Sequence, residues 1–321
     1  MSRSLSKSLQ IALPLGLGIF LIWYIYHSFT PQQLAETQKY FADANYGFVL
    51  LSVALSVLSH LSRSYRWNFM LEPLGYKTRL ANNFMAVSVA YLMNVFIPKS
   101  GEVSRGIILD KYEGVPFQKG FGTIISERVV DLLFLLFFTV LALAIKFEVL
   151  YDYVLESIPP SILYVILFGI VLLGISIPLY IKFSQSNVNI KLKAFVVGLK
   201  EGVFSILKMK EKGAFLFHTF IIWGLYLLSF YTAMHALPDT ANIPFGTIII
   251  TFVVGSFTFA FTNSGFGTYP AAVAGILTVF GVAKTVGIAF GWIVWVSNIC
   301  SIVFFGVLSL LLLPFYNRAT A

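Results

Sequence analysis

Long apolar runs alternate with short charged loops along this chain. A run of about 18 or more apolar residues is long enough to cross the hydrocarbon core of a bilayer as a helix. The pattern predicts six such spans: Ile11–Phe29, Tyr46–Met70, Phe121–Ile145, Ile162–Ile181, Ala214–Leu237 and Gly287–Pro314. The first run is longer than the apolar region of a signal peptide, so we expect it to be retained as a span.

Two further apolar segments are interrupted by polar residues, proline and glycine. The segment Ala81–Ile97 is followed by a break within Asn94-Val-Phe-Ile-Pro-Lys-Ser-Gly-Glu-Val-Ser-Arg105 and continues as Glu102–Tyr112. The segment Phe245–Phe261 runs into Thr-Asn-Ser-Gly-Phe-Gly and continues as Tyr269–Phe280. Broken backbone at membrane depth is tolerated only where protein or a water-filled cavity surrounds it. We therefore expect two hairpins of half-helices, broken at Ser100-Gly101 and Ser264-Gly265.

The charges of the loops indicate how these hairpins enter the membrane. Basic loops favour the cytoplasmic side of a membrane. If Ala81–Ile97 does not cross the membrane, all the basic stretches can lie on that side: those near Arg3, Arg63–Arg79 and Lys182–Lys212. This reading predicts one re-entrant hairpin from the cytoplasm, one from outside, and cytoplasmic N- and C-termini. The alternative, eight full crossings, keeps both termini inside but puts three basic residues outside: Lys99, Arg105 and Lys111.

The two halves of the chain repeat the same order of elements: span, span, hairpin, span. An odd number of full crossings in residues 1–160 would leave residues 161–321 inverted in the membrane. Inverted repeats whose broken helices meet near the midplane are typical of alternating-access carriers. We therefore expect an all-α polytopic membrane protein, with a single transmembrane domain over residues 1–321 built from two opposed copies.

Composition supports a membrane protein. The chain is 58% hydrophobic and 11% charged, whereas soluble domains carry about 25% charged residues. The net charge of +8 comes from lysines and arginines in loops, which the cytoplasmic bias explains without a nucleic-acid partner. Cys300 is the only cysteine, which excludes an intramolecular disulfide. No nucleotide, metal or nucleophile motif stands in a suitable context, so we expect neither a cofactor nor enzymatic activity.

Ionisable groups at membrane depth are costly and indicate function, and the first break contains several. Glu102 opens the returning half-helix, where an acid suits the helix dipole and could be only a cap. Arg105 lies one turn later; its guanidinium could hold a phosphate bidentately or pair with Glu102. The neighbouring Asn94, Lys99 and Ser100 complete this candidate site.

A second charged group opens the third span. Glu127 and Asp131 are spaced i, i+4 and share a helix face, while Arg128 and Asp131 form an i, i+3 pair. The group could be a structural salt-bridge cluster or an ion or proton relay.

Two more groups of residues allow two interpretations each. His60, Arg63 and Trp67 share one helix face, with Arg66 beside them; they could be interfacial anchors that snorkel or a lipid-phosphate site.

The second break offers small polar groups and flexible backbone, which serve either close packing or binding: Asn263, Ser264, Gly265 and Gly267.

Three strings together resemble the flippase-like membrane domain of lysylphosphatidylglycerol synthases, over about Ser8 to Phe315. They are Asn94-x-x-x-Pro-x-x-Gly-Glu-x-x-Arg105, Glu127-Arg-x-x-Asp131 and Ser264-Gly-Phe-Gly267. The resemblance implies a translocase of phospholipids or polyprenyl phosphates in a bacterial or archaeal cytoplasmic membrane. It also implies that a head-group cavity is lined by Glu102, Arg105, Glu127, Arg128 and Asp131.

The chain departs from this family pattern in two ways. The sequence has no aminoacyl-transferase domain, so we do not expect it to synthesise lysyl-phosphatidylglycerol. Relatives often carry an acid soon after the second glycine break, where this chain has Tyr269-Pro270. A head-group contact from the second hairpin is therefore not predicted by the resemblance.

The leading hypothesis is a lipid flippase that binds an anionic head group between the hairpin tips. Arg105 or Arg128 would neutralise the phosphate, and Glu102 and Asp131 would hold those arginines or exchange protons. The alternative is a non-transporting accessory subunit for a lipid-modifying glycosyltransferase. An intramembrane enzyme comes third, because no nucleophile–base or metal constellation is visible in the sequence.

The predicted topology can be tested by cysteine labelling in a Cys300→Ser background. Single cysteines replacing Lys77 and Lys119 should both react only from the cytoplasm, since a hairpin returns the chain to the side it left. Cysteines replacing Asp239 and Lys284 should both react from outside. Labelling of Lys77 and Lys119 variants from opposite faces would contradict the cytoplasmic hairpin.

Overall fold

The computed structural model of the chain describes residues 19–145, 209–262 and 264–318, with isolated positions at 16, 147, 148, 168 and 172. It divides into two compact units, one formed by Met1–Ile124 with Met209–Ala321 and the other by Ile125–Lys208. The predicted span Ile162–Ile181 and the start of Ile11–Phe29 lie outside the described residues. The two units are considered separately below.

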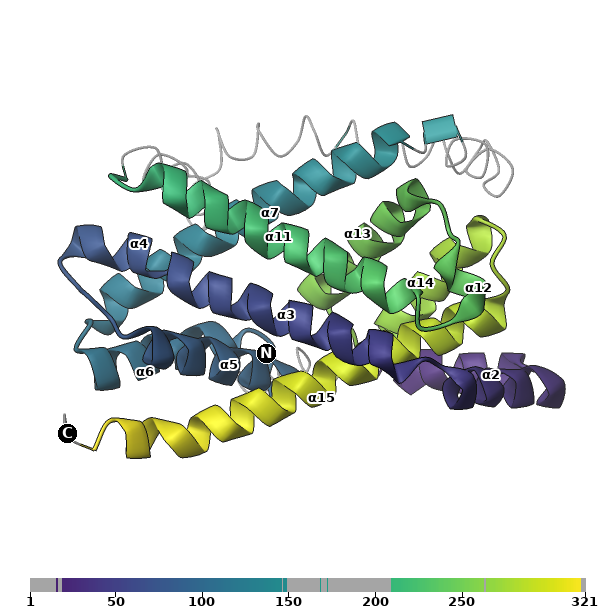
Figure 1. Ribbon diagram of the computed structural model, residues 1–321, viewed down its shortest axis with the longest axis horizontal. Helices are drawn as coiled ribbons and strands as arrows, with labels where there is room; N and C mark the ends of the chain where they lie inside the picture. The colour runs from purple at the N-terminus through teal and green to yellow at the C-terminus, as the bar shows by residue number, and fades with distance from the viewer. Residues whose placement is uncertain are drawn as a thin grey trace. The chain divides into compact units, whose positions relative to one another are not determined.

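Every regular element in the described residues is a helix (Figure 1). A helix over Ile19–Ser28 precedes α2 Pro31–Asp43, α3 Tyr46–Arg66, α4 Asn68–Leu71, the 3-10 helix η1 Glu72–Leu74, α5 Leu80–Phe96, α6 Ser100–Glu113, α7 Phe117–Ile145, α11 Lys212–Met234, α12 Pro238–Ala241, α13 Phe245–Phe261, α14 Thr268–Val279 and α15 Lys284–Tyr316.

Four helical segments are long and apolar enough to cross a membrane: Tyr46–Leu74, Phe117–Ile145, Lys212–Met234 and Lys284–Tyr316. They coincide with four of the six predicted spans. The half-helices α5, α6, α13 and α14 likewise match the interrupted segments, with ends shifted by no more than a few residues. These findings confirm a helical, multi-pass membrane protein.

The helices α5 and α6 form an antiparallel hairpin. At its tip, the backbone N–H of Gly101 donates to Asn94 Oδ1 over 2.8 Å. At its base, Arg79 Nε donates to Glu113 Oε1 over 3.0 Å, and Asn82 Nδ2 donates to the same carboxylate. The chain therefore folds back on itself between α5 and α6. The side of the membrane from which this hairpin enters stays a prediction.

The helices α13 and α14 pack against each other in the same way across the second break. Gly255 of α13 lies so close to Tyr269 of α14 that a β-carbon there would stand 2.7 Å from the tyrosine ring. Each break also contains a non-glycine residue in the left-handed region, Lys99 with φ 62° and Ser264 with φ 52°. Such residues cost about 1 kcal/mol or more and persist only where their surroundings hold them.

The long helix α15 provides the surface on which both hairpins pack. Its first half faces α14, because a β-carbon on Gly291 would stand 2.6 Å from the Cα of Pro270. Its second half faces α5, because a β-carbon on Gly306 would stand 2.5 Å from the Cβ of Leu92. Between these contacts, Trp295 Nε1 donates to the carbonyl of Ser264 over 2.8 Å. The hairpins thus approach each other from opposite ends of α15.

The helices α3 and α11 run antiparallel, side by side (Figure 1). Ser52 and Ser229 join their hydroxyls over 3.0 Å, and Ser59 Oγ donates to the carbonyl of Ile222 over 3.1 Å. Small residues let membrane helices approach closely, and their hydroxyls bond across the interface. The antiparallel pairing agrees with the expected inversion of the halves, which stays a prediction because the span Ile162–Ile181 lies outside the described residues.

The hairpin tip should be intolerant of side-chain volume at Gly101. A β-carbon there would stand 2.1 Å from the carbonyl oxygen of Ala90, so Gly101→Ala must displace backbone and should cost at least about 1–3 kcal/mol. The control is Gly224→Ala on α11, where nothing lies within 4 Å; it should be neutral or slightly stabilising. Equal thermal unfolding midpoints of the two variants in micelles would contradict the close packing.

Candidate functional site

Three arginines are buried in the first unit, one of them stacked on a tryptophan and the other two just before that tryptophan in the chain. The residues Arg63, Arg66 and Arg105 are 3%, 0% and 2% exposed, and Trp67 is 0% exposed. The last turn of α3 carries Arg63 and Arg66, Trp67 follows it directly, and α6 supplies Arg105. We refer to these four residues as the arginine–tryptophan cluster.

Trp67 holds Arg105 by stacking. The guanidinium carbon of Arg105 stands 3.6 Å from the centroid of the indole ring, which is close contact between a cation and an aromatic face. The indole is itself fixed, because Trp67 Nε1 donates to Thr123 Oγ1 over 2.8 Å. The guanidinium is planar and its fork of donors suits bidentate binding of phosphate or carboxylate, and the stacking restricts its orientation.

Arg66 is held by α11 instead. Its Nη1 donates to Thr219 Oγ1 over 2.8 Å, and its guanidinium carbon lies 5.1 Å from the centroid of the Phe215 ring. The interpretation of Arg63, Arg66 and Trp67 as snorkelling interfacial anchors is therefore wrong. Snorkelling needs a head group that reaches water, whereas contacts with other helices bury these side chains.

The polar residues at the two breaks hold the hairpin tips together. Ser264 Oγ donates to the carbonyl of Asn94 over 3.2 Å, so the tips meet as expected. Ser100 Oγ lies within hydrogen-bonding distance of two carbonyls at the end of α5, those of Met93 at 2.9 Å and Ile97 at 2.7 Å. Asn94, Ser100 and Ser264 are thus used within the fold.

The remaining break residues have different surroundings. Lys99 directly precedes α6 and is exposed, while Glu102 lies half-buried in the first turn. Gly265 and Gly267 have φ of 72° and 66° and form the turn into α14. Asn263 lies outside the described residues.

The acidic group on α7 belongs to the second unit. Glu127 is 0% exposed and Asp131 is 9% exposed. Arg128 Nη1 lies 3.8 Å from Asp131 Oδ2 as the expected i, i+3 pair, with the arginine side chain 42% exposed. The pair supports a structural role for Arg128 and Asp131, and a relay through Glu127 and Asp131 stays a prediction.

No sequence pattern signals the groups that hold Arg66 and the Trp67 ring. Thr123 and Thr219 are ordinary hydroxyl residues of apolar helices, and only the folded contacts show that they bind Trp67 and Arg66. Trp67 was identified on the same face as Arg63, but its stacking partner comes from α6, 38 positions along the chain. Among the described residues, no three His, Cys, Asp or Glu side chains gather in a group that could hold a metal.

Broken helices, apolar spans and buried arginines define a multi-pass helical membrane protein with a charged interior site. Residues 11–309 match the family described as the lysylphosphatidylglycerol synthase TM region, and the chain belongs to this family. The match confirms the resemblance seen in the sequence motifs.

Archaeal proteins are among its relatives. The chain is 34% identical over 104 residues to a UPF0104 membrane protein of Methanocaldococcus jannaschii, an alignment that covers 32% of this chain and 31% of that protein. It is 25% identical over 254 residues to a UPF0104 membrane protein of Pyrococcus horikoshii, covering 71% and 73%. The glycosyltransferase AglD of Haloferax volcanii is 26% identical over 100 residues, covering 31% and 16%. No solved structure matches the chain.

The bond between Thr123 and Trp67 should contribute measurably to stability. Thr123→Val leaves the buried indole N–H without its acceptor, which should cost about 1–3 kcal/mol. In a Trp67→Phe background the same change should cost less, because no N–H remains to be satisfied. Thr139→Val is the control, since its hydroxyl donates to the Leu135 carbonyl of its own helix. Additive losses in denaturant unfolding would contradict the coupling.

Proposed function

We propose that this protein is a lipid translocase that moves an anionic phospholipid or a polyprenyl-phosphate-linked lipid between leaflets, without enzymatic activity. The observation that carries the proposal is the arginine–tryptophan cluster, in which three arginines are buried in a membrane protein. Membership of a family named after a lipid synthase region supports a lipid as the substrate.

The chemistry of these arginines favours an anionic ligand. Arginines within the membrane segments of a protein are rare and mark functional sites, and this fold buries three. Arginine is the preferred residue for bidentate phosphate recognition. Arg105 is the best placed, because its stacking on Trp67 orients the guanidinium before a ligand arrives.

The opposed hairpins suggest how access to the site could alternate. Their tips touch through Ser264 and Asn94, and Trp295 of α15 bonds the same serine. Arg105 lies one helical turn beyond Gly101, so a movement of the α5–α6 hairpin would displace the arginine with it. In carriers with broken helices, such movements expose one site to each side in turn. The lipid tails would stay in the bilayer throughout.

The carboxylates of the candidate site would complement the arginines. We propose that Glu102 orients Arg105 and Asp131 orients Arg128 when no lipid is bound, and that Glu127 exchanges protons during transport. Arg128 is a second candidate for the phosphate. We place the protein in the cytoplasmic membrane with both termini in the cytoplasm, as the loop charges favour.

A second candidate function is that of an accessory subunit that docks a lipid-modifying glycosyltransferase without moving lipid. The observation that favours it is the local similarity to a protein named glycosyltransferase AglD. Under this proposal the buried arginines would stabilise the fold or bind a static lipid, and the hairpins would not need to move.

The phosphate role of Arg105 can be tested with the protein reconstituted in liposomes. Arg105→Lys keeps the charge but loses the planar fork, so translocation of fluorescent phosphatidylglycerol or polyprenyl phosphate should fall about tenfold or more, as expected when about 1.5–3 kcal/mol of a charged hydrogen bond is lost. Arg105→Ala should fall further. Arg318→Lys is the control, because Arg318 is exposed near the C-terminus.

Thermal stability has to be measured for the same variants, so that loss of fold is separated from loss of binding. A folded Arg105→Lys variant that moves lipid at the wild-type rate would make Arg105 structural. If the wild type moves neither phosphatidylglycerol, its aminoacyl forms nor polyprenyl phosphates, the translocase proposal fails. Stimulation of a co-reconstituted polyprenyl-phosphate glycosyltransferase would then support the accessory role.

A further inference from the structure

Buried side chains bond the base of the α5–α6 hairpin to the end of α15. Asn82 of α5 and Asn317, which directly follows α15, are 1% and 2% exposed. Asn82 Nδ2 donates to Asn317 Oδ1 over 2.9 Å, and Asn317 Nδ2 donates back to Asn82 Oδ1 over 3.0 Å. The two carboxamides thus form a reciprocal pair, which holds only while the two helix ends stay in register.

Two charged residues complete this contact. Arg79, which directly precedes α5, donates through Nη2 to Asn317 Oδ1 and to the Tyr112 carbonyl in the last turn of α6. Its Nε donates to Glu113 Oε1 over 3.0 Å, and the Glu113 side chain is 7% exposed. Arg79 therefore joins both halves of the hairpin to the end of α15. We refer to Arg79, Asn82, Glu113 and Asn317 as the latch.

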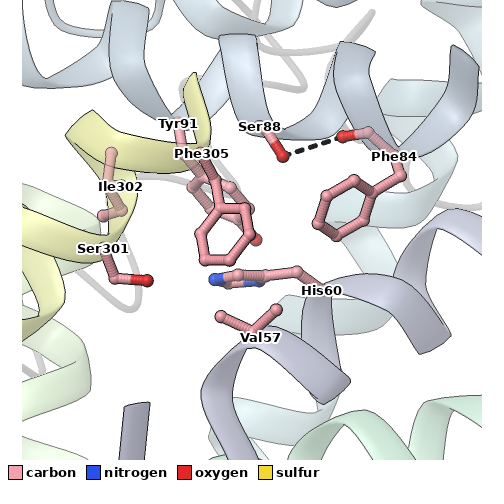
Figure 2. Close-up of a pocket in the computed structure, with 8 residues that line it drawn as sticks. All are labelled: Val57, His60, Phe84, Ser88, Tyr91, Ser301, Ile302 and Phe305. Carbon is pink, nitrogen blue, oxygen red and sulfur yellow. Dashed lines mark hydrogen bonds between the residues drawn. The ribbon is translucent and has the colours of Figure 1, made fainter. Parts of the chain in front are cut away.

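Further along the same interface, the contact between α5 and α15 is apolar and close. Phe84 and Phe305 pack edge to face, with ring centroids 6.0 Å apart. Ser88 Oγ donates to the Phe84 carbonyl of its own helix over 2.9 Å (Figure 2). A β-carbon on Gly306 would stand 2.5 Å from the Leu92 Cβ, so the helices approach most tightly there. At about 1.5 Å per residue, this contact lies about 15 Å along α5 from the latch.

The hairpin is connected to the rest of the chain through two loops that contain glycine in the left-handed region. Gly75, before α5, has φ 88°, and Gly114, after α6, has φ 66°. Both are exposed, and a β-carbon on either would meet nothing within 4 Å. Hinge motions are absorbed by a few loop residues of this kind. The two loops therefore allow the hairpin to tilt about its close contact at Gly306.

We propose that the latch is a gate, which opens when the base of the α5–α6 hairpin separates from α15 and closes when its bonds form again. Side-chain bonds at helix ends can be exchanged for bonds to water, so their net contribution to the closed state is small. The apolar contact at Gly306 gains nothing from water and acts as the pivot. Arg105 lies on α6 about 12 Å from its base, at about 1.5 Å per residue. Opening of the gate would therefore lead water and a lipid head group toward this arginine.

The proposal deepens the alternating-access part of the proposed function, and it rests on that function only for the purpose of the motion. The opening itself is measured without lipid transport. If the gate opens but no lipid is moved, the translocase proposal fails alone. If lipid moves while the latch is cross-linked, the gate fails alone.

The test uses the full chain in phosphatidylcholine nanodiscs, with Cys300→Ser as the background and Ser88→Cys as the reporter. Ser88 is 6% exposed and lines a cavity between α3, α5 and α15 that has room for about one water molecule (Figure 2). A charged, water-soluble maleimide therefore reaches this thiol only when the base opens. Labelling should be slow with the latch intact. Asn317→Ala should accelerate it about tenfold, as expected when the net contribution of the amide pair is lost.

Three further variants make the result specific to the latch. Asn82→Ala removes the other amide of the pair and should accelerate labelling to a similar extent. Asn298→Ala is the matched control on α15, because this amide donates to the Val294 carbonyl of its own helix; it should leave the rate unchanged. A second reporter, Val273→Cys on α14, replaces a residue that is 0% exposed and should not respond to Asn317→Ala.

A cross-link tests whether the motion is used. In the Cys300→Ser background without the reporter, Asn82→Cys and Asn317→Cys are joined by a short, reducible bifunctional thiol reagent. Translocation of fluorescent phosphatidylglycerol should stop on cross-linking and recover on reduction, because the base of the hairpin can no longer leave α15.

Three results would overturn the proposal. The first is unchanged labelling of Ser88→Cys in Asn317→Ala and Asn82→Ala variants whose thermal unfolding matches that of the parent. The second is equal acceleration at the Val273→Cys reporter, which would show general loosening of the fold and not a gate. The third is translocation at the unmodified rate after complete cross-linking of the latch. The labelling experiment decides on the gate even where no lipid is moved.

Discussion

The fold depends on satisfying backbone groups where two apolar helical segments are broken. Apolar surroundings offer no hydrogen bonds, so the protein itself must supply them. Ser100 reaches the carbonyls at the end of α5, and Asn94 accepts from Gly101 at the start of α6. At the second break, Trp295 donates to the Ser264 carbonyl. The serine hydroxyl then bonds Asn94. Each break is therefore stabilised partly by its own hairpin and partly by another element.

This requirement also determines where charge can be placed. A hairpin that folds back within the protein returns its second half-helix through the interior, and α6 carries Arg105 inside with it. Trp67 covers that guanidinium and Thr219 binds Arg66. A cation held on an aromatic face in a site shielded from water interacts more strongly with an anion than it would at the surface. The break between α5 and α6 thus leaves backbone groups that other residues must satisfy, and the helix that follows it carries the candidate binding residue, Arg105.

The arginine–tryptophan cluster offers positive charge and planar donors inside the first unit. Two of its arginines come from α3, which pairs with α11 through small hydroxyl residues. Close packing of these two helices therefore supports the candidate site.

The sequence by itself determined the class of protein, the positions of four spans and of both breaks, and the family, because hydrophobic length and Pro/Gly interruptions are local properties of the chain. It could not decide which polar residues bind ligand and which hold the fold, since this depends on neighbours distant in sequence. Asn94 and Ser264 are 170 positions apart and proved to be partners. Arg63 and Arg66 resembled interfacial anchors, but packing of other helices buries them. Burial and pairing are properties of the tertiary structure alone.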